Sequence, residues 1–208
     1  DLHLSLRRQR QMCIRDSSKC TIMSKLVVIS APSGAGKTSI ANCLINRIEQ
    51  LSFSISATSR SPRVDEKDSV NYYFKSIDEF KNDINKNLFI EWQEVYSDKF
   101  YGTYLKELNR IWSLNKVVLL DVDVFGGINI KNKFEKNCLS IFIMPPSKNE
   151  LLNRLKKRDS ESQSQLLERE QKMDLELNQS SKFDCIIKNI ILEEACLEAE
   201  KIVRNFLK

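Results

Sequence analysis

A glycine-rich turn between an apolar run and a helical pattern constrains the fold more than any other feature of the sequence. The run Leu26–Ile29 leads into Ser30-Ala-Pro-Ser-Gly-Ala-Gly-Lys-Thr38, and apolar residues at helical spacing follow. The glycines let the backbone curl so that its N–H groups converge on a phosphate, while Lys37 can bridge phosphate oxygens and Thr38 can bind Mg²⁺. The general motif begins with glycine where this chain has Ala31, so an ordinary glycine-rich turn is the alternative. The position between strand and helix favours a phosphate-binding loop.

Short apolar runs alternate with helical patterns along the rest of the chain. The runs Val117–Leu120, Leu139–Met144 and Cys185–Ile187 are each followed by a helical stretch. Strands that are apolar on both faces and separated by helices are typical of a mostly parallel sheet covered on both sides. We therefore expect an α/β fold, a three-layer sandwich of the P-loop NTPase type.

Residues 53–104 depart from this alternation. They contain alternating and aromatic segments around one short helix, expected near Ile77–Ile84. This pattern predicts a small, strand-rich insert after the first core strand, on a core formed by residues 23–52 and 105–208. Such an insert is well placed to carry a second substrate.

A lid is predicted between two helices in the last third of the chain. Ser147-Lys-Asn-Glu150 is a capping box, which predicts a helix running to about Lys157. The polar stretch that follows has no apolar residue to anchor it, so we expect a mobile lid at about residues 158–166. Helical periodicity resumes at Leu166 and continues through Met173 and Leu177.

The charge of the chain is concentrated at its start. The formal net charge is +5, but residues 1–22 contribute +3 and the rest of the chain +2, a balance that suits small anionic ligands better than nucleic acid. Residues 1–22 show neither helical nor strand periodicity, and we expect them to be a leader outside a fold that starts at Met23. No run approaches the roughly 20 apolar residues of a membrane span, so we expect a cytoplasmic protein without membrane contact.

Cysteine and histidine usage narrows the chemistry. The six cysteines form no C-x-x-C pair, which indicates neither a zinc site nor a disulfide framework. The one histidine, His3, lies in the expected leader. Catalysis by a histidine base or nucleophile is therefore not expected.

Six motifs in a fixed order carry a family resemblance: APSGAGKT, TSRSPR, NYYF, FIEW, FYGT and DVDVFGG. On these motifs the chain, from Met23 to its C-terminus, resembles the guanylate kinase family. The resemblance implies Mg²⁺-dependent phosphoryl transfer from ATP to GMP, giving ADP and GDP. ATP and GMP are then the expected partners, with Mg²⁺ as the expected cofactor.

The acceptor site is expected in the insert. Two arginines flank a proline turn in Thr58–Arg63, an arrangement able to clamp a phosphate, although two solvated loop arginines are the alternative. The resemblance implies that the GMP phosphate is held by Arg60, Arg63, Tyr72 and Tyr101. It implies that guanine is recognised by Glu91, Ser56, Thr103 and Asp123. For Glu91, a surface carboxylate on an edge strand is the alternative.

The donor site is expected at the glycine-rich loop. The resemblance implies that ATP is bound by Ser33, Gly34, Ala35, Gly36, Lys37, Thr38, Ser39 and Asn189. Val117–Asp121 resembles the acidic strand of P-loop enzymes, so Mg²⁺ is expected at Thr38 and Asp121. The expected catalytic residues are Lys37, Arg154, Arg158 and Arg169.

The chain departs from the family pattern at a few positions. Asp159 stands where many relatives have glycine, Phe125 where many have glutamine, and Ile190-Ile191 replaces an acidic pair after Asn189. These positions concern the lid, the guanine pocket and the adenine site.

Two other functions are compatible with parts of the pattern. One is a non-catalytic guanylate-kinase-like module that binds proteins, although such modules usually lose the loop lysine and lid arginines that this chain keeps. The other is a P-loop kinase with a different acceptor. The sequence predicts neither a monomer nor a homo-oligomer.

Overall fold

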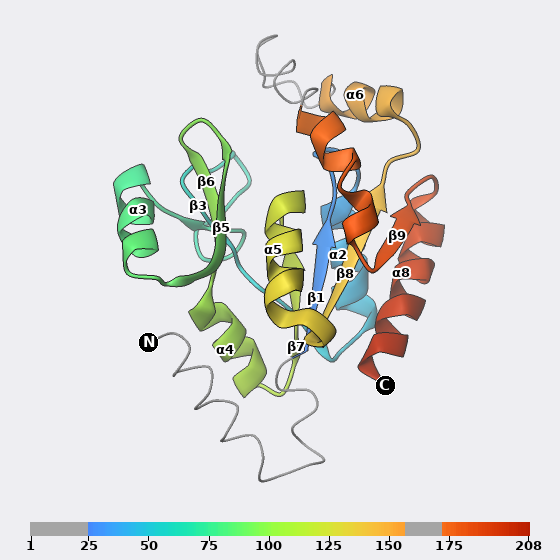
Figure 1. Cartoon of the computed structure of the whole chain (residues 1–208), viewed down its shortest axis with the longest axis horizontal. Coiled ribbons are helices and arrows are strands. Elements are labelled where there is room, and N and C mark those ends of the chain that lie inside the picture. The colour runs from blue at the N-terminus through green and yellow to red at the C-terminus, as the bar shows by residue number, and fades with distance from the viewer. Residues whose placement is uncertain (1–24, 157–171) are drawn as a thin grey trace.

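A parallel sheet of five strands forms the centre of the larger part of the molecule (Figure 1). The computed structural model describes residues 25–156 and 172–208. The strand order is β2-β7-β1-β8-β9, and every neighbouring pair is parallel. The strands are β1 (Leu26–Ser30), β2 (Leu51–Phe53), β7 (Val117–Asp121), β8 (Cys138–Met144) and β9 (Cys185–Lys188).

Alternate residues of the central strands face two separate apolar clusters. Val27 and Ile29 of β1 belong to one cluster with helices α2 (Lys37–Arg47) and α8 (Leu192–Leu207). Leu26 and Val28 belong to the other, with α4 (Leu105–Ser113) and α5 (Val124–Phe134). Helices therefore cover both faces of the sheet, and the expected three-layer α/β sandwich is confirmed.

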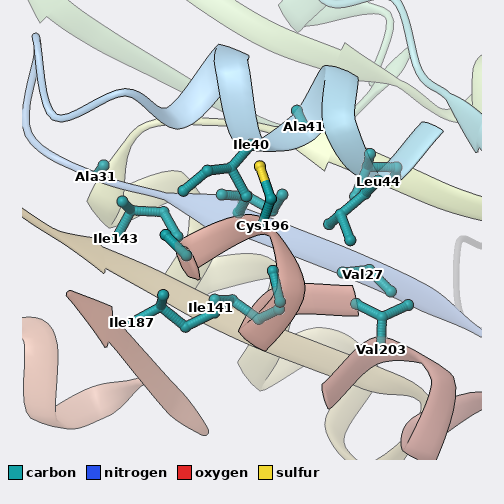
Figure 2. Packing of buried hydrophobic residues seen from close by; sticks show 14 of the residues in the cluster. Val27, Ala31, Ile40, Ala41, Leu44, Ile141, Ile143, Ile187, Cys196 and Val203 are labelled. Carbon is teal, nitrogen blue, oxygen red and sulfur yellow. The ribbon is translucent and has the colours of Figure 1, made fainter. Parts of the chain in front are cut away.

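The first of these clusters joins the phosphate-loop helix to the C-terminal helix. Figure 2 shows Ile40 and Leu44 of α2 gathered with Val27, Ile141 and Cys196, and all five side chains are buried. Burying an aliphatic side chain of this kind contributes about 1.5–3 kcal/mol, so the cluster fixes α2, and with it the loop in front of α2, on the sheet.

A second sheet lies beyond α5, on the left in Figure 1, and α5 contacts its strand β5. Its order is β4-β3-β6-β5, so that β5 is an edge strand. Phe80 of α3 stacks on Phe89 with ring centroids 4.6 Å apart, and a Ser76–Glu79 capping box begins that helix. The elements are β3 (Ala57–Thr58), β4 (Tyr73–Phe74), α3 (Ile77–Asn85), β5 (Phe89–Tyr96) and β6 (Lys99–Tyr104).

The structure differs from the sequence prediction at β2. We predicted Phe53 as the start of the insert, whereas Leu51–Phe53 pairs with β7 as the edge of the core sheet. Three residues are too few to show a periodic signal, and the pairing depends on a strand more than 60 positions away.

Helix α6 (Lys148–Lys156) begins after Ser147, whose Oγ accepts from the Glu150 N–H at 3.1 Å. The predicted lid at 158–166 lies outside the described residues.

Candidate active site

A cleft lies between the glycine-rich loop and the second sheet. The loop, the end of β7 and strands β5 and β6 all contribute to its lining. Fourteen of the predicted site residues line it: Ser33, Gly34, Gly36, Lys37, Thr38, Ser39, Ser56, Arg60, Arg63, Tyr72, Glu91, Tyr101, Asp121 and Asp123. Ala35, Thr103 and Asn189 are buried behind the lining.

The loop requires glycine at position 36 for two reasons. Gly36 has φ +93°, and a Cβ there would lie 2.3 Å from Asn189 Nδ2. That same Nδ2 donates to the Ala35 carbonyl at 2.8 Å, so Asn189 braces the loop from behind. Because no side chain caps α2, its first N–H groups and the positive end of its dipole stay available to an anion.

Lys37 and Asp121 form the charged centre of the donor side. Lys37 Nζ lies 2.6 Å from Asp121 Oδ1 and donates to the Val122 carbonyl at 2.7 Å. Burial disfavours the ammonium, but the adjacent Asp121 carboxylate outweighs it and raises the pKa of Lys37. The lysine is therefore held charged at the loop.

Thr38 and Asp121 supply oxygen atoms beside that lysine. Thr38 Oγ1 donates to Asp121 Oδ2 at 3.0 Å. A hydroxyl and a carboxylate are hard oxygen donors of the type that Mg²⁺ prefers, and Mg²⁺ commonly takes only one or two such protein ligands. The two residues present therefore fit the ion that the sequence predicts.

Arg60 is held by a carboxylate that the sequence analysis did not single out. Its guanidinium makes two 2.6 Å bonds to Glu66, and its Nε donates to the Tyr101 hydroxyl at 3.2 Å. It also lies 5.0 Å from the ring centroid of Tyr72. These contacts fix the guanidinium plane at the cleft, which Arg63 also lines. Glu66 lies only three residues after Arg63, but nothing in the sequence separates it from a solvated loop acid.

Glu91 is a desolvated carboxyl group on the second-sheet side of the cleft. Burial, with a further contribution from nearby Asp123, raises the pKa of Glu91 to about 8. Its Oε1 accepts from the Thr103 hydroxyl at 3.3 Å, which places Thr103 next to the cleft without lining it. The expected alternative, a surface carboxylate, is wrong.

The start of α5 makes room for the two acids. Asp123 caps the helix, with its Oδ1 accepting from Gly126 N at 2.6 Å. A Cβ on Gly126 would lie 2.5 Å from Glu91 Oε2 and 3.0 Å from Asp123 Oδ1. Phe125, one of the departures from the family pattern, is 36% exposed.

Eight further residues line the cleft that were not proposed from the sequence, and four of them lie outside the six motifs: Gln93, Val95, Tyr96 and Glu176. Burial raises the pKa of Glu176 to about 7, partly offset by Lys172. A sequence signal existed for Glu176, because it lies three residues after Met173 on the buried side of a predicted amphipathic helix.

The predicted lid arginines are not placed. Arg154 belongs to α6, whose backbone is described there, whereas Arg158, Asp159 and Arg169 lie outside the described residues.

Within residues 25–156 and 172–208, no group of three or more histidine, cysteine or acidic side chains could hold a metal ion, and no helix is both long and apolar enough to cross a membrane.

Comparison with known proteins identifies the family. The family model described as guanylate kinase matches residues 23–206. A guanylate kinase of Bacteroides fragilis is 44% identical over 184 residues, which is 88% of this chain and 90% of that protein, and one of Porphyromonas gingivalis is 43% identical over 89% of this chain and 99% of its own. The crystal structure of guanylate kinase from Anaplasma phagocytophilum superposes with a TM-score of 0.71 at 29% identity, covering 88% of this chain and 85% of that one. The chain therefore belongs to the guanylate kinase family.

Proposed function

We propose that this guanylate kinase transfers the terminal phosphoryl group of ATP to GMP in the cleft between the glycine-rich loop and the second sheet. The observation that carries the proposal is that Lys37 and Glu91 line the same cleft, one from the core and the other from β5. We further propose that residues 53–104 act as the GMP-binding insert on a core of residues 23–52 and 105–208.

The loop is the proposed donor site. The backbone N–H groups at the start of α2 and the Lys37 ammonium hold the ATP phosphates, and the lysine exchanges its bonds to Asp121 and Val122 for phosphate oxygens. Thr38 and Asp121 would hold Mg²⁺, which when bound supplies positive charge that offsets the charge of the phosphates. Asn189 supports this site by bracing the loop at Ala35.

Glu91 is the proposed discriminator of the acceptor base. Its carboxylate accepts from N1–H and the 2-amino group of guanine, with Asp123 beside the 2-amino group and Ser56 and Thr103 near O6 and N7. Adenine has neither the N1 proton nor the 2-amino group. It would leave the desolvated Glu91 carboxylate without partners from the base, at a cost of about 1–3 kcal/mol or more.

The acceptor phosphate is proposed to bind Arg60, Arg63, Tyr72 and Tyr101. Glu66 holds the Arg60 guanidinium in one orientation, so less side-chain entropy is lost when a phosphate arrives. The two tyrosines contribute hydroxyl groups.

No general base is needed for this reaction. The second ionisation of a phosphate monoester has a pKa of about 6, so the GMP phosphate is already largely dianionic at neutral pH. The chain's residues align the two phosphates in line and offset their charge, with Lys37 on the donor side and Arg154, Arg158 and Arg169 proposed to act at the transferring group.

The experiment is a coupled assay of ADP formation with GMP, dGMP and AMP as acceptors. We expect GMP-dependent ADP formation that is lost on chelating Mg²⁺ and in K37M, and that is far weaker with AMP. Folded protein without GMP-dependent turnover would favour a non-catalytic binding module. A preference for AMP would indicate a kinase with another acceptor.

A further inference from the structure

Strand β5, which carries Glu91, has an irregular ladder at each end. It pairs with β6 on one side only, as the edge of the second sheet. The pairing register shifts between Phe89 and Glu91 and again between Glu94 and Tyr96, so Ile90 and Val95 are passed over. An edge strand with two bulges has few backbone bonds to fix its position.

Lysines from the core bind the carbonyls of those two bulge residues. Lys133 of α5 donates to the Ile90 carbonyl at 3.0 Å, and Lys172 donates to the Val95 carbonyl at 3.0 Å. Glu91 and Gln93 lie between the two anchored positions and line the cleft. The lysines therefore hold the part of β5 that faces the proposed acceptor.

Of the two anchoring lysines, Lys172 is the one that can be replaced without directly changing the titration of Glu91. Its Nζ lies 5.0 Å from the centroid of the Tyr96 ring and 3.8 Å from Glu176 Oε1, and its side chain is only 17% exposed. A carbonyl, an aromatic face and a carboxylate together offset the desolvation of the ammonium. Lys133, by contrast, interacts electrostatically with Glu91 itself, so replacing it would also change the titration of Glu91.

Glu176 completes the anchor on the core side. Its side chain is 8% exposed, and among the described residues its carboxylate has Lys172 as its one ion-pair partner and no hydrogen bond. Helical residues 172–177 thus present a lysine and a glutamate along one face, four residues apart, and the lysine reaches across to β5.

We propose that Lys172 is a positioning residue for the acceptor nucleotide. It fixes the bulge at Val95 in edge strand β5 to the core, so that Glu91 and Gln93 keep their place in the cleft. The inference rests on the proposed function, since it assigns the acceptor to this strand. Lys172 touches neither reacting group and acts through Val95. Its loss should weaken the binding of GMP and leave that of ATP nearly unchanged.

The chain offers a matched control at Lys25. Lys25 Nζ donates to the Phe206 carbonyl at 2.9 Å and lies 5.1 Å from the Phe206 ring, the same pair of contacts at a position outside the cleft. K172M and K25M therefore each remove a bond to a carbonyl and a contact with a ring, one at the acceptor strand and one elsewhere, while K172M also removes the ion pair with Glu176. K172R keeps the charge and the donors.

Steady-state kinetics with each substrate varied, and calorimetric titration of GMP without ATP, test the inference. We expect K172M to raise KM and Kd for GMP about tenfold, the effect of losing one charge-assisted hydrogen bond, with KM for ATP within about twofold. K172R should recover most of the loss, and K25M should lower the melting temperature without changing either KM. K172Q, which keeps a donor but no charge, provides an intermediate value if K172M does not fold.

Two results would overturn the inference. One is a K172M or K172Q protein whose GMP affinity stays within twofold of the wild type, and the other is an equal loss for GMP and ATP. Failure of the proposed function has a different signature, because the wild-type and K25M proteins would then fail to phosphorylate GMP. The calorimetric comparison of K172M with K25M does not depend on turnover.

Discussion

A Cβ atom at Gly126 would lie 2.5 Å from Oε2 of Glu91, closer than non-bonded atoms approach. The first turn of α5 therefore has room for the carboxyl group only because residue 126 has no side chain. This places the proposed guanine-binding carboxyl against a helix of the core, although Glu91 itself belongs to the second sheet.

The first prediction concerns G126A. Alanine favours a helix interior over glycine by about 1 kcal/mol, so the variant should stay folded. Its methyl group should push Glu91 out of place and raise KM for GMP about tenfold, with KM for ATP unchanged. G127A is the contrasting variant, because a Cβ there meets Ser30 Oγ at 2.3 Å inside the core and should lower the melting temperature. Equal KM for GMP in G126A and the wild type would argue against the position assigned to the base.

The second prediction concerns the choice of base. E91Q keeps the size of the side chain but replaces an acceptor oxygen with an N–H donor, which faces a guanine donor unfavourably. We expect kcat/KM for GMP to fall about 100-fold and that for AMP to change little. Parallel assays with the two nucleotides measure the ratio of kcat/KM for GMP to that for AMP. The same ratio in E91Q and the wild type would contradict the role of Glu91.

The third prediction is a pH dependence of GMP affinity. The pKa of Glu91 is raised to about 8 in the free protein, and two guanine donors favour the ionised form. Binding should therefore release a proton, and affinity should increase as pH rises from 7 towards 8 and level off above. Because the GMP phosphate is already largely dianionic in this range, it contributes little to the change. Calorimetry in buffers of different ionisation enthalpy counts the protons, and E91Q should show no release.

The fourth prediction concerns stability. The pKa of Glu176 is raised to about 7 in the folded protein, from an ordinary value of 4.5. The folded state then binds the proton more tightly than the unfolded state, so this contribution is fully present below about pH 4.5 and is lost as pH rises through about 7. E176Q should remove a penalty of up to about 3 kcal/mol at pH 8 and little at pH 4. Melting temperatures at the two pH values test this, and an equal shift at both would contradict it.

The sequence was sufficient for features that depend on local pattern. The glycine-rich loop lies between an apolar run and a helix, and the buried strands β1, β7 and β8 are almost entirely apolar, so the loop and these strands are predicted close to their observed bounds. The short helix predicted near Ile77–Ile84 is observed as Ile77–Asn85, and the Ser76–Glu79 capping box that begins it depends on residues within one turn. In each case neighbouring residues determine the structure.

Features that depend on tertiary contacts could not be predicted. The pairing of Arg60 with Glu66 and the binding of Lys172 to the Val95 carbonyl join groups whose sequence context is that of ordinary surface charges. The desolvation of the Glu91 carboxyl group depends on where α5 packs, and Glu91 itself is one acid in a strand that also contains Glu94. Strand β2 is defined by its partner β7 rather than by its own three residues.

The central claim is that donor and acceptor nucleotides meet end to end between Lys37 and Glu91. The most direct measurement is the affinity of a compound in which adenosine and guanosine are joined through their 5′ positions by a chain of five phosphates. The wild-type protein should bind this compound at least about 100-fold more tightly than ATP or GMP alone, and K37M and E91Q should each weaken it at least about tenfold. Two results would contradict a single cleft that holds both nucleotides. One is an affinity for the joined compound no higher than that for ATP or GMP, whichever binds more tightly, and the other is an affinity that E91Q leaves unchanged.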